Sequence, residues 1–417
     1  MNSQKNTKLE LGDTKTVGVV DTDTHPDTFI DVMIDDVPEP WRSMYYKNRP
    51  HDVENGRFFY APPTSARIDA TITGKRPGED KALYAEQVLQ ETDTDYAVLL
   101  PLSRGKWWDP EWESAKSSAT NTYIAREWLG TENNWHGRYL SGIRVSPGDP
   151  DRAVAEIRKW AGHPYFCQVQ FAPEVLTAPA GHPMYRAVFR EAAAQGLPVA
   201  MHITRETSMQ SMTPVGYSSY HIEAMGSWGM YYAAHLASLI FDGVFSELPE
   251  LKVVFVEGGF TWAAPLLWRL DKYWAELGSE VPHVKRKPSE YARDQLRITT
   301  QPLEEPKDPR DLVRIIEAMN GQDILMFSSD YPHWDYDDPR HVASRLPAEW
   351  RDKVMFQNAC DLYGLPATRP VDALDLEADS MTRYRHQAPA TQHMDSYGQL
   401  ITTAKSAASF DDFVATD

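Results

Sequence analysis

The stretch VVDTDTHPD, from Val19 to Asp27, places three aspartates and a histidine directly behind an apolar run. Alternate residues of an extended chain share one face, so Asp23 and His25 are expected to lie side by side at the end of a strand. A carboxylate beside an imidazole is a common ligand pair for a divalent metal ion. The stretch therefore predicts a strand that carries metal-binding side chains at its C-terminal end.

Comparable runs recur along the chain, each rich in β-branched residues, ending in polar ones and leading into a helix-like segment. The candidate strands are 17–23, 95–101, 139–147, 166–172, 197–204, 251–259, 296–302 and 324–332. Eight strands that alternate with helices predict an α/β fold, a (β/α)₈ barrel of the TIM type, whose active site lies at the C-terminal ends of the strands. A doubly wound sheet is the alternative.

Amphipathic segments separate the candidate strands. Residues 149–163 carry apolar residues at helical spacing behind Asp149, which can cap the helix. Residues 183–196 form a second such segment, and Gly196 closes it in the position that favours a left-handed residue.

Three segments do not follow this alternation. Residues 26–78 are rich in proline, aromatic residues and charge, so we expect a lid insertion over the mouth of a metal-dependent barrel that spans residues 14–365. Residues 204–232 follow the fifth strand, and their methionine, glycine, serine and tyrosine content suits an adaptable pocket wall. Residues 366–417 lose the periodicity and are predicted to form a C-terminal arm or tail, suited to packing on a neighbouring subunit.

Composition narrows the class of partner. The 417 residues include 42 Lys and Arg against 60 Asp and Glu, a net charge of −18, which argues against nucleic acid and membrane surfaces because both favour basic proteins. Cys167 and Cys360 have no CxxC spacing, so neither a disulfide framework nor a zinc knuckle is predicted. No apolar signal segment and no run of about 18 apolar residues occurs. We expect a cytoplasmic protein with a small-molecule substrate.

Polar side chains collect at the C-terminal ends of the predicted strands. They are Asp23, His25, His202, Glu257, Thr299, Thr300, Gln301, Asp330 and His333. Each has a simpler interpretation alone, because a single histidine such as His202 is often a core residue and Asp330 or Glu257 is compatible with a turn. Opposite strands of a barrel face one pore, so their coincidence at strand ends favours a metal site.

The motifs DTDTH, GLPVAMHIT and MFSSDYPHWD together resemble the amidohydrolase-related proteins. This branch of the amidohydrolase superfamily includes aminocarboxymuconate-semialdehyde decarboxylase and the resorcylate-type decarboxylases. The resemblance covers about residues 17–365. It implies a (β/α)₈ barrel with one Zn²⁺ or Mn²⁺ ion, held by Asp23, His25, His202 and Asp330.

One position departs from these relatives. They usually carry a histidine near the end of the sixth strand, where this chain has Glu257. An ionised carboxylate there would repel an anionic substrate by about 1 to 4 kcal/mol at a separation of about 4 Å, unless a cation such as Arg205 offsets it. His235, on the helical segment before that strand, is a candidate substitute for the missing histidine.

The leading functional hypothesis is a mononuclear metal-dependent hydrolase. A metal-activated water would attack a small aromatic or cyclic substrate, while Asp330 and Glu257 transfer the proton. Arg205, Trp262, His333 and Trp334 are the candidate substrate-binding residues; the alternative for the tryptophans, which include Trp107, Trp108 and Trp228, is packing between helices and barrel.

Two other functions stay open. The first is metal-dependent, non-oxidative decarboxylation of an aromatic or enol-type acid, which the resemblance implies with the same metal cage. The second is a catalytically silent barrel that binds a ligand, although a base beside the ion argues against it. The C-terminal tail and the resemblance together predict a homodimer or homotetramer.

Overall fold

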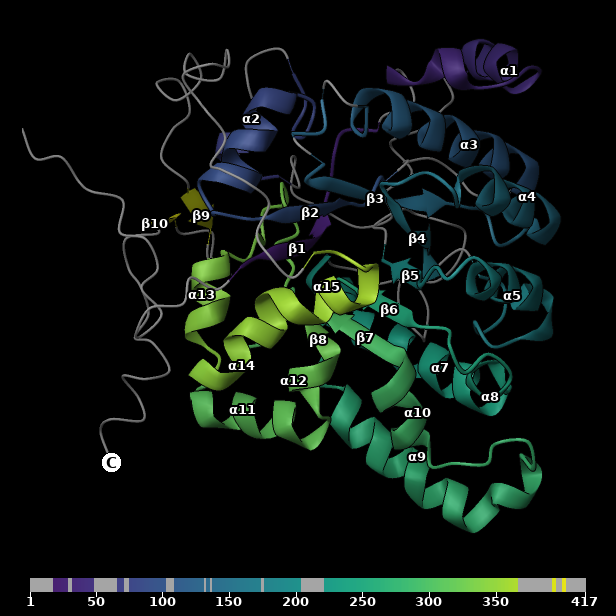
Figure 1. The fold of residues 1–417 in the computed structure, drawn as a ribbon, viewed down its shortest axis with the longest axis vertical. Coiled ribbons are helices and arrows are strands. Elements are labelled where there is room, and N and C mark those ends of the chain that lie inside the picture. The colour runs from purple at the N-terminus through teal and green to yellow at the C-terminus, as the bar shows by residue number, and fades with distance from the viewer. Residues whose placement is uncertain are drawn as a thin grey trace, which may run out of the picture.

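Eight parallel strands follow one another in chain order around a single sheet (Figure 1). The computed structural model describes residues 18–28, 32–48, 66–70, 75–102, 109–130, 133–135, 137–173, 176–203, 221–366, 392–394 and 400–402. The strands are β1 Val20–Thr24, β2 Tyr96–Leu99, β3 Tyr139–Arg144, β4 Phe166–Phe171, β5 Val199–His202, β6 Val253–Val256, β7 Leu296–Thr299 and β8 Leu325–Met326. Each corresponds to one of the eight predicted strands.

The sheet closes where β8 returns to β1. The backbone N–H of Thr22 donates to the carbonyl of Phe327 at 3.0 Å, and that of Asp330 donates to the carbonyl of Asp23 at the same distance. These bonds join the first strand to the last, which an open doubly wound sheet cannot do. The prediction of a (β/α)₈ barrel is confirmed.

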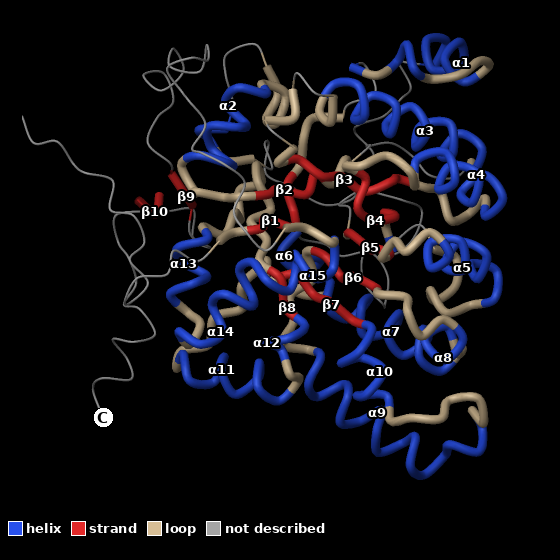
Figure 2. The backbone as a smooth tube through the Cα atoms, viewed as in Figure 1, coloured by secondary structure: helices blue, strands red, loops and turns tan. Residues whose placement is uncertain are grey.

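Most of the helices lie around the outside of the strands, whereas α15 lies across one end of the barrel (Figure 2). They are α1 Trp41–Asn48, α2 Lys81–Ala85, α3 Pro110–Glu127, α4 Pro150–Trp160, α5 Arg186–Ala194, α6 His221–Met225, α7 Trp228–Phe241, α8 Val244–Glu247, α9 Ala263–Leu277, α10 Pro288–Gln295, α11 Pro309–Ala318, α12 Gly321–Ile324, α13 Pro339–Ser344, α14 Ala348–Asp352 and α15 Asn358–Tyr363. Among the described helices, none is both long and apolar enough for a transmembrane span.

The helix ends follow the local sequence. Asp149 caps α4, because its carboxylate accepts the N–H of Arg152 at 3.2 Å. Gly196 lies just beyond α5 with a φ of +69°, a conformation that glycine adopts without steric cost. Both predicted helix boundaries are confirmed.

The barrel interior is a separate apolar cluster beneath the predicted site. Six strands contribute side chains to it, and the last helical segments cover it from below. The strand residues are Val20, Val98, Leu140, Ala200, Val254, Val256 and Met326, and the helical residues are Phe356 and Cys360. Side chains alternate in and out along a strand, so the polar residues that follow these apolar ones stand at the open C-terminal end.

The predicted lid segment is described only in part. Met33 packs against Ala119 of α3, and at the other end of the segment Ala66 pairs with His333 in an antiparallel bridge. Residues 49–65, most of 204–232 and most of the C-terminal arm lie outside the described residues. In the arm, β9 Gln392–Met394 and β10 Leu400–Thr402 pair antiparallel. The lid and arm assignments therefore stay predictions.

A buried ion pair fastens the described end of this segment to the barrel. Arg67 donates to Asp69 through Nε at 3.0 Å and Nη2 at 2.8 Å, and both side chains are buried. The Arg67 guanidinium also lies 4.3 Å from the ring centre of Tyr336, in the loop that follows β8. The segment is thus anchored beside the C-terminal end of the eighth strand.

Replacing Asp69→Asn is expected to lower the free energy of unfolding by about 3 kcal/mol, because a buried guanidinium loses its counter-charge. Chemical denaturation measures the change. The control is Asp311→Asn, which breaks an exposed pair with Arg314 at 2.7 Å and should cost less than about 1 kcal/mol. Equal small losses in both variants would contradict the anchoring role.

Candidate metal centre

A bulge in β1 turns Asp23 and His25 toward the open end of the barrel. The pairing of β1 with β2 shifts register between Asp21 and Thr24, and such a shift redirects the side chains that follow it. His25 Nδ1 lies 2.8 Å from the carbonyl of Leu100. A carbonyl only accepts, so Nδ1 carries the proton and neutral His25 keeps the lone pair on Nε2.

Asp21, the remaining acid of this strand, has a different place. One carboxylate oxygen accepts the backbone N–H of Ser329 at 2.9 Å and that of Asp23 at 3.2 Å. Burial raises its pKa to about 7, although these hydrogen bonds act in the opposite direction. Asp21 therefore ties β1 to the segment that follows β8, whereas Asp23 and His25 face the centre.

His202 and Glu257 complete a cluster with these two residues. His202 Nε2 lies 3.4 Å from Asp23 Oδ1 and 3.2 Å from Glu257 Oε2, and His25 Nε2 lies 3.1 Å from Asp23 Oδ1. All four side chains are buried, and one ligand atom from each lies within 4.8 Å of the others.

These separations fit a bound divalent ion. Metal–ligand bonds of about 2.0 to 2.2 Å place neighbouring ligands about 3.0 to 3.5 Å apart. Neither carboxylate oxygen of Asp23 and neither ring nitrogen of His202 makes a hydrogen bond of acceptable geometry within the described residues. Buried polar atoms in that condition are costly, and a cation in the cluster would satisfy one ligand atom from each residue.

Electrostatics also favour a cation here. Burial by itself lowers the pKa of His25, yet the carboxylates of Asp23 and Asp330 outweigh burial and raise that pKa well above its usual value. Burial raises the pKa of Asp23, but His202 and His25 bring it well below the usual range. The cluster thus attracts positive charge, and a metal ion can replace the proton.

Asp330 lies on the other side of His25. Its Oδ1 is 2.9 Å from His25 Nε2 and 2.5 Å from His333 Nδ1, and its Oδ2 is 3.3 Å from Gln301 Nε2. It forms a second possible ligand group with His25, Glu257 and His333. Three of the four predicted ligands, Asp23, His25 and His202, therefore share one group, in which Glu257 takes the fourth place, and Asp330 contacts that group through His25.

Both Glu257 and Asp330 have left-handed backbones, with φ values of 62° and 61°. This conformation costs a residue other than glycine on the order of 1 to 3 kcal/mol and persists only when the surroundings enforce it. The N–H of Glu257 donates to Thr299 Oγ1 at 3.1 Å, and the N–H of Asp330 is held by Asp23. Strain at both carboxylates is typical of a functional site.

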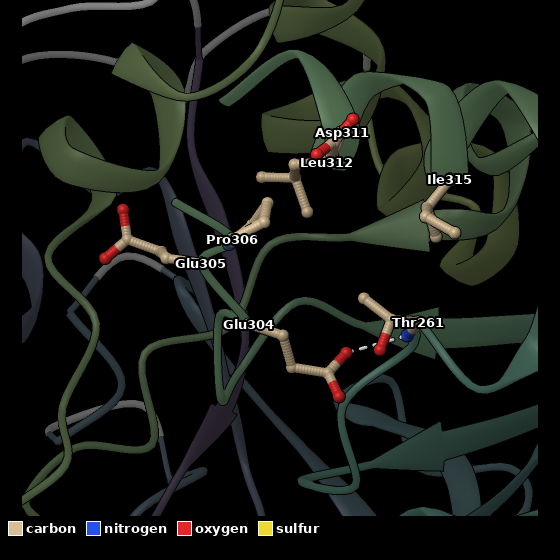
Figure 3. Close-up of a pocket in the computed structure, with 7 residues that line it drawn as sticks. All are labelled: Thr261, Glu304, Glu305, Pro306, Asp311, Leu312 and Ile315. Atoms are coloured by element: carbon tan, nitrogen blue, oxygen red, sulfur yellow. Dashed lines mark hydrogen bonds between the residues drawn. The ribbon is translucent and has the colours of Figure 1, made fainter. Parts of the chain in front are cut away.

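Glu304 holds the turn that follows Glu257. Its carboxylate accepts the N–H of Phe260 at 3.0 Å. It also accepts the N–H of Thr261 at 2.7 Å, the bond drawn in Figure 3. At Gly259, with a φ of +63°, an added Cβ would lie 2.8 Å from the Glu304 carboxyl carbon. In the sequence, only the two glycines that follow Glu257, Gly258 and Gly259, indicate this anchor. Paired glycines are typical of a turn to which another part of the chain comes close.

A cavity of about 310 Å³ lies beside this turn (Figure 3). Its lining residues are Thr261, Glu304, Glu305, Pro306, Asp311, Leu312 and Ile315. None of the candidate metal ligands is among them, so the cavity is distinct from the metal centre.

The other predicted site residues lie in different places. His235 is buried in α7, where its Nδ1 accepts the N–H of Ala180 at 3.1 Å and burial lowers its pKa to about 4; the structure does not bring it to the cluster. Trp262 donates Nε1–H to the carbonyl of Gly259 at 2.9 Å. Trp334 is partly buried and follows His333, and Arg205 lies outside the described residues.

Of the other tryptophans predicted near the barrel mouth, one is described and two are not. Trp228 is buried in the core between helices and barrel, as the packing alternative expected. Trp107 and Trp108 lie outside the described residues.

Comparisons with known proteins agree with this architecture. A family model described as amidohydrolase matches residues 20–365. A comparison with curated protein sequences finds no match.

Several solved structures share the fold. An amidohydrolase from Mycobacterium avium subsp. paratuberculosis has a TM-score of 0.63 at 21% identity, over 84% of this chain and 100% of its own. The 5-carboxyvanillate decarboxylase from Sphingomonas paucimobilis has a TM-score of 0.60 at 20% identity, and the match covers 84% of this chain and 100% of that one. The 5-carboxyvanillate decarboxylase from Novosphingobium aromaticivorans was solved with bound manganese and 3-methoxy-4-hydroxy-5-nitrobenzoic acid. It has a TM-score of 0.63 at 19% identity, and the match covers 85% of this chain and 98% of that one.

Replacing His202→Ala is expected to reduce bound divalent metal severely while the barrel stays folded, because one buried ligand of the cluster is lost. Metal analysis of the purified protein, with circular dichroism for the fold, measures both effects. His235→Asn is the matched control, since it alters a buried histidine outside the cluster and should leave metal content unchanged. Full metal in the His202 variant would refute the ligand assignment.

Proposed function

Because the chain belongs to the amidohydrolase family, we propose that it is a hydrolase that acts on a small, uncharged aromatic or cyclic molecule with the help of one divalent ion. Asp23, His25, His202 and Glu257 would hold the ion at the C-terminal end of the barrel, with Glu257 in the place expected for Asp330. When bound, the ion supplies Lewis acidity toward a substrate oxygen and lowers the pKa of water in the site.

Asp330 has the position of a general base. Its Oδ1 contacts His25 and His333, and its Oδ2 accepts from Gln301, so the carboxylate is oriented from three sides. It would take a proton from the attacking water and return it to the leaving group, a role that contributes about 10²- to 10⁴-fold to rate. His333 and Trp334 follow it in the chain and would form one wall of the substrate site.

The observation that carries the choice of hydrolysis is the charge of the centre. Three carboxylates are buried at the same end of the barrel, those of Asp23, Glu257 and Asp330. When ionised they carry three negative charges, one more than a divalent ion neutralises. A substrate carboxylate placed about 4 Å from a remaining negative charge would be repelled by about 1 to 4 kcal/mol. An uncharged ester, amide or lactone avoids this penalty.

Decarboxylation of an aromatic acid is the second candidate. Several solved structures with this fold are 5-carboxyvanillate decarboxylases, and the enzyme from Novosphingobium aromaticivorans holds manganese. In this chain such a substrate would need a cation near the centre. Arg144, the last residue of β3, is buried, and its Nη1 donates to the carbonyl of Pro101 at 2.9 Å. Because it ends its strand at the same end of the barrel as the cluster, it is the residue we propose for that role.

A paired assay separates the reactions. The metal-loaded protein is given a panel of neutral aryl esters, amides and lactones, and a parallel panel of ortho-hydroxybenzoic acids, with carbon dioxide release measured for the second. We expect turnover in the first panel. Carbon dioxide release alone would establish the second candidate, and metal binding without turnover in either panel would favour a ligand-binding barrel.

The charge argument has its own test. Glu257→Gln keeps the shape of the side chain and removes one negative charge, so a benzoate-type carboxylate should bind roughly tenfold more tightly. Because Glu257 is also a proposed ligand, calorimetry of benzoate, with benzamide as the uncharged control ligand, measures the difference on protein that metal analysis shows to hold the ion. Glu317→Gln, at an exposed position of α11, is the control variant. Equal changes for both ligands would contradict repulsion by Glu257.

A further inference from the structure

The hydroxyl of Tyr232 lies between the ends of two neighbouring strands. Tyr232 belongs to α7 and is fully buried, and its Oη is 2.7 Å from the carbonyl oxygen of Met201 and 2.5 Å from that of Val256. Met201 directly precedes His202 in β5, and Val256 directly precedes Glu257 after β6. Two backbone carbonyls therefore share one phenolic O–H, and each belongs to the residue just before a candidate metal ligand.

The ring that carries this hydroxyl packs against two aromatic rings that also contact each other, Phe255 and Trp262. It stacks on Phe255 with ring centres 4.5 Å apart and planes 15° from parallel, and the ring centre of Trp262 lies 6.5 Å away with its plane tilted by 27°. At Gly258 an added Cβ would lie 2.1 Å from Tyr232 Cε2. The glycine therefore lets the ring reach the strand ends, and the packing prevents it from moving away.

The strand ends need such a link. The pairing of β5 with β6 stops at His202 and Val256, and Glu257 then turns into the left-handed conformation. Beyond that point the separation of His202 Nε2 and Glu257 Oε2, 3.2 Å, depends on how the two strand ends are held together.

We propose that Tyr232 is a positioning residue that sets the spacing of the metal-binding side chains of His202 and Glu257. The proposal rests on the proposed function, because it requires that these two residues hold the ion. Tyr232 itself touches neither the ion nor the substrate. It acts through the backbone of Met201 and Val256, from the helix outside the barrel.

Tyr232→Phe removes the hydroxyl and keeps the ring in its stack. The two carbonyls lose their shared donor, and the ligand spacing is no longer enforced. Loss of a group that orients a metal ligand typically lowers metal affinity 10- to 100-fold, and we expect a loss in this range.

The matched control is Tyr185→Phe. Tyr185 is also buried, and its hydroxyl accepts the N–H of Thr177 at 2.9 Å, outside the candidate metal centre. This variant loses a buried hydroxyl of the same kind, so it reports the general effect of such a loss on the protein. Its metal affinity should match that of the wild type.

The experiment titrates full-length metal-free wild type, Tyr232→Phe and Tyr185→Phe with Mn²⁺, and follows free Mn²⁺ by electron paramagnetic resonance. Visible spectra of the Co²⁺-loaded proteins report ligand geometry, and thermal unfolding of the metal-free forms reports stability. We expect weaker Mn²⁺ binding and an altered Co²⁺ spectrum only in Tyr232→Phe.

The outcomes separate this inference from the proposed function. If the wild type binds neither ion, the metal centre itself is wrong. If the wild type binds and Tyr232→Phe has the same affinity and spectrum, the positioning role is overturned. Equal losses of affinity in both tyrosine variants would also overturn it, because they would reflect a loosened fold rather than ligand spacing.

Discussion

The seam between β1 and β8 is the constraint on which the metal centre depends. At this seam the N–H of Asp330 donates to the carbonyl of Asp23 at 3.0 Å, which places two residues about 300 positions apart in direct contact. Their side chains then share His25, whose Nε2 lies 3.1 Å from one carboxylate and 2.9 Å from the other. An open sheet of the same strands would leave these residues at opposite edges.

Closure also creates the electrostatic problem that the metal solves. Three carboxylates are buried together, with little solvent to reduce their mutual repulsion. Histidine protonation relieves part of it, as the raised pKa of His25 indicates, but a divalent cation offers more charge and bonds to more of the ligand atoms. Under the proposed function, the same excess of negative charge that favours the ion would disfavour an anionic substrate, so ion binding and substrate preference would have one physical origin.

The eight strands and the convergence of Asp23, His25, His202 and Asp330 could be predicted from sequence, because apolar runs that end in polar residues leave a local pattern. The closeness of Glu257 to His202 could not, since it depends on a left-handed turn and on the register of two strands. His235 shows the opposite error: its place before β6 suggested the site, yet the orientation of α7 directs it toward Ala180.

The least predictable part of the site is its outer support. Left-handed carboxylate residues such as Glu257 are strained, and the strain is balanced by bonds from elsewhere: Thr299 from β7, Glu304 from the loop beyond it, and Tyr232 from α7. None of these residues carries metal-binding chemistry that a motif would reveal. Thr299 accepts the N–H of Glu257 itself, Tyr232 donates to the carbonyl just before it, and Glu304 holds the turn three and four residues later. We therefore expect a change in any of them to move the carboxylate while every ligand side chain stays intact. The position of the ion is therefore a property of three elements around β6 rather than of the ligands alone.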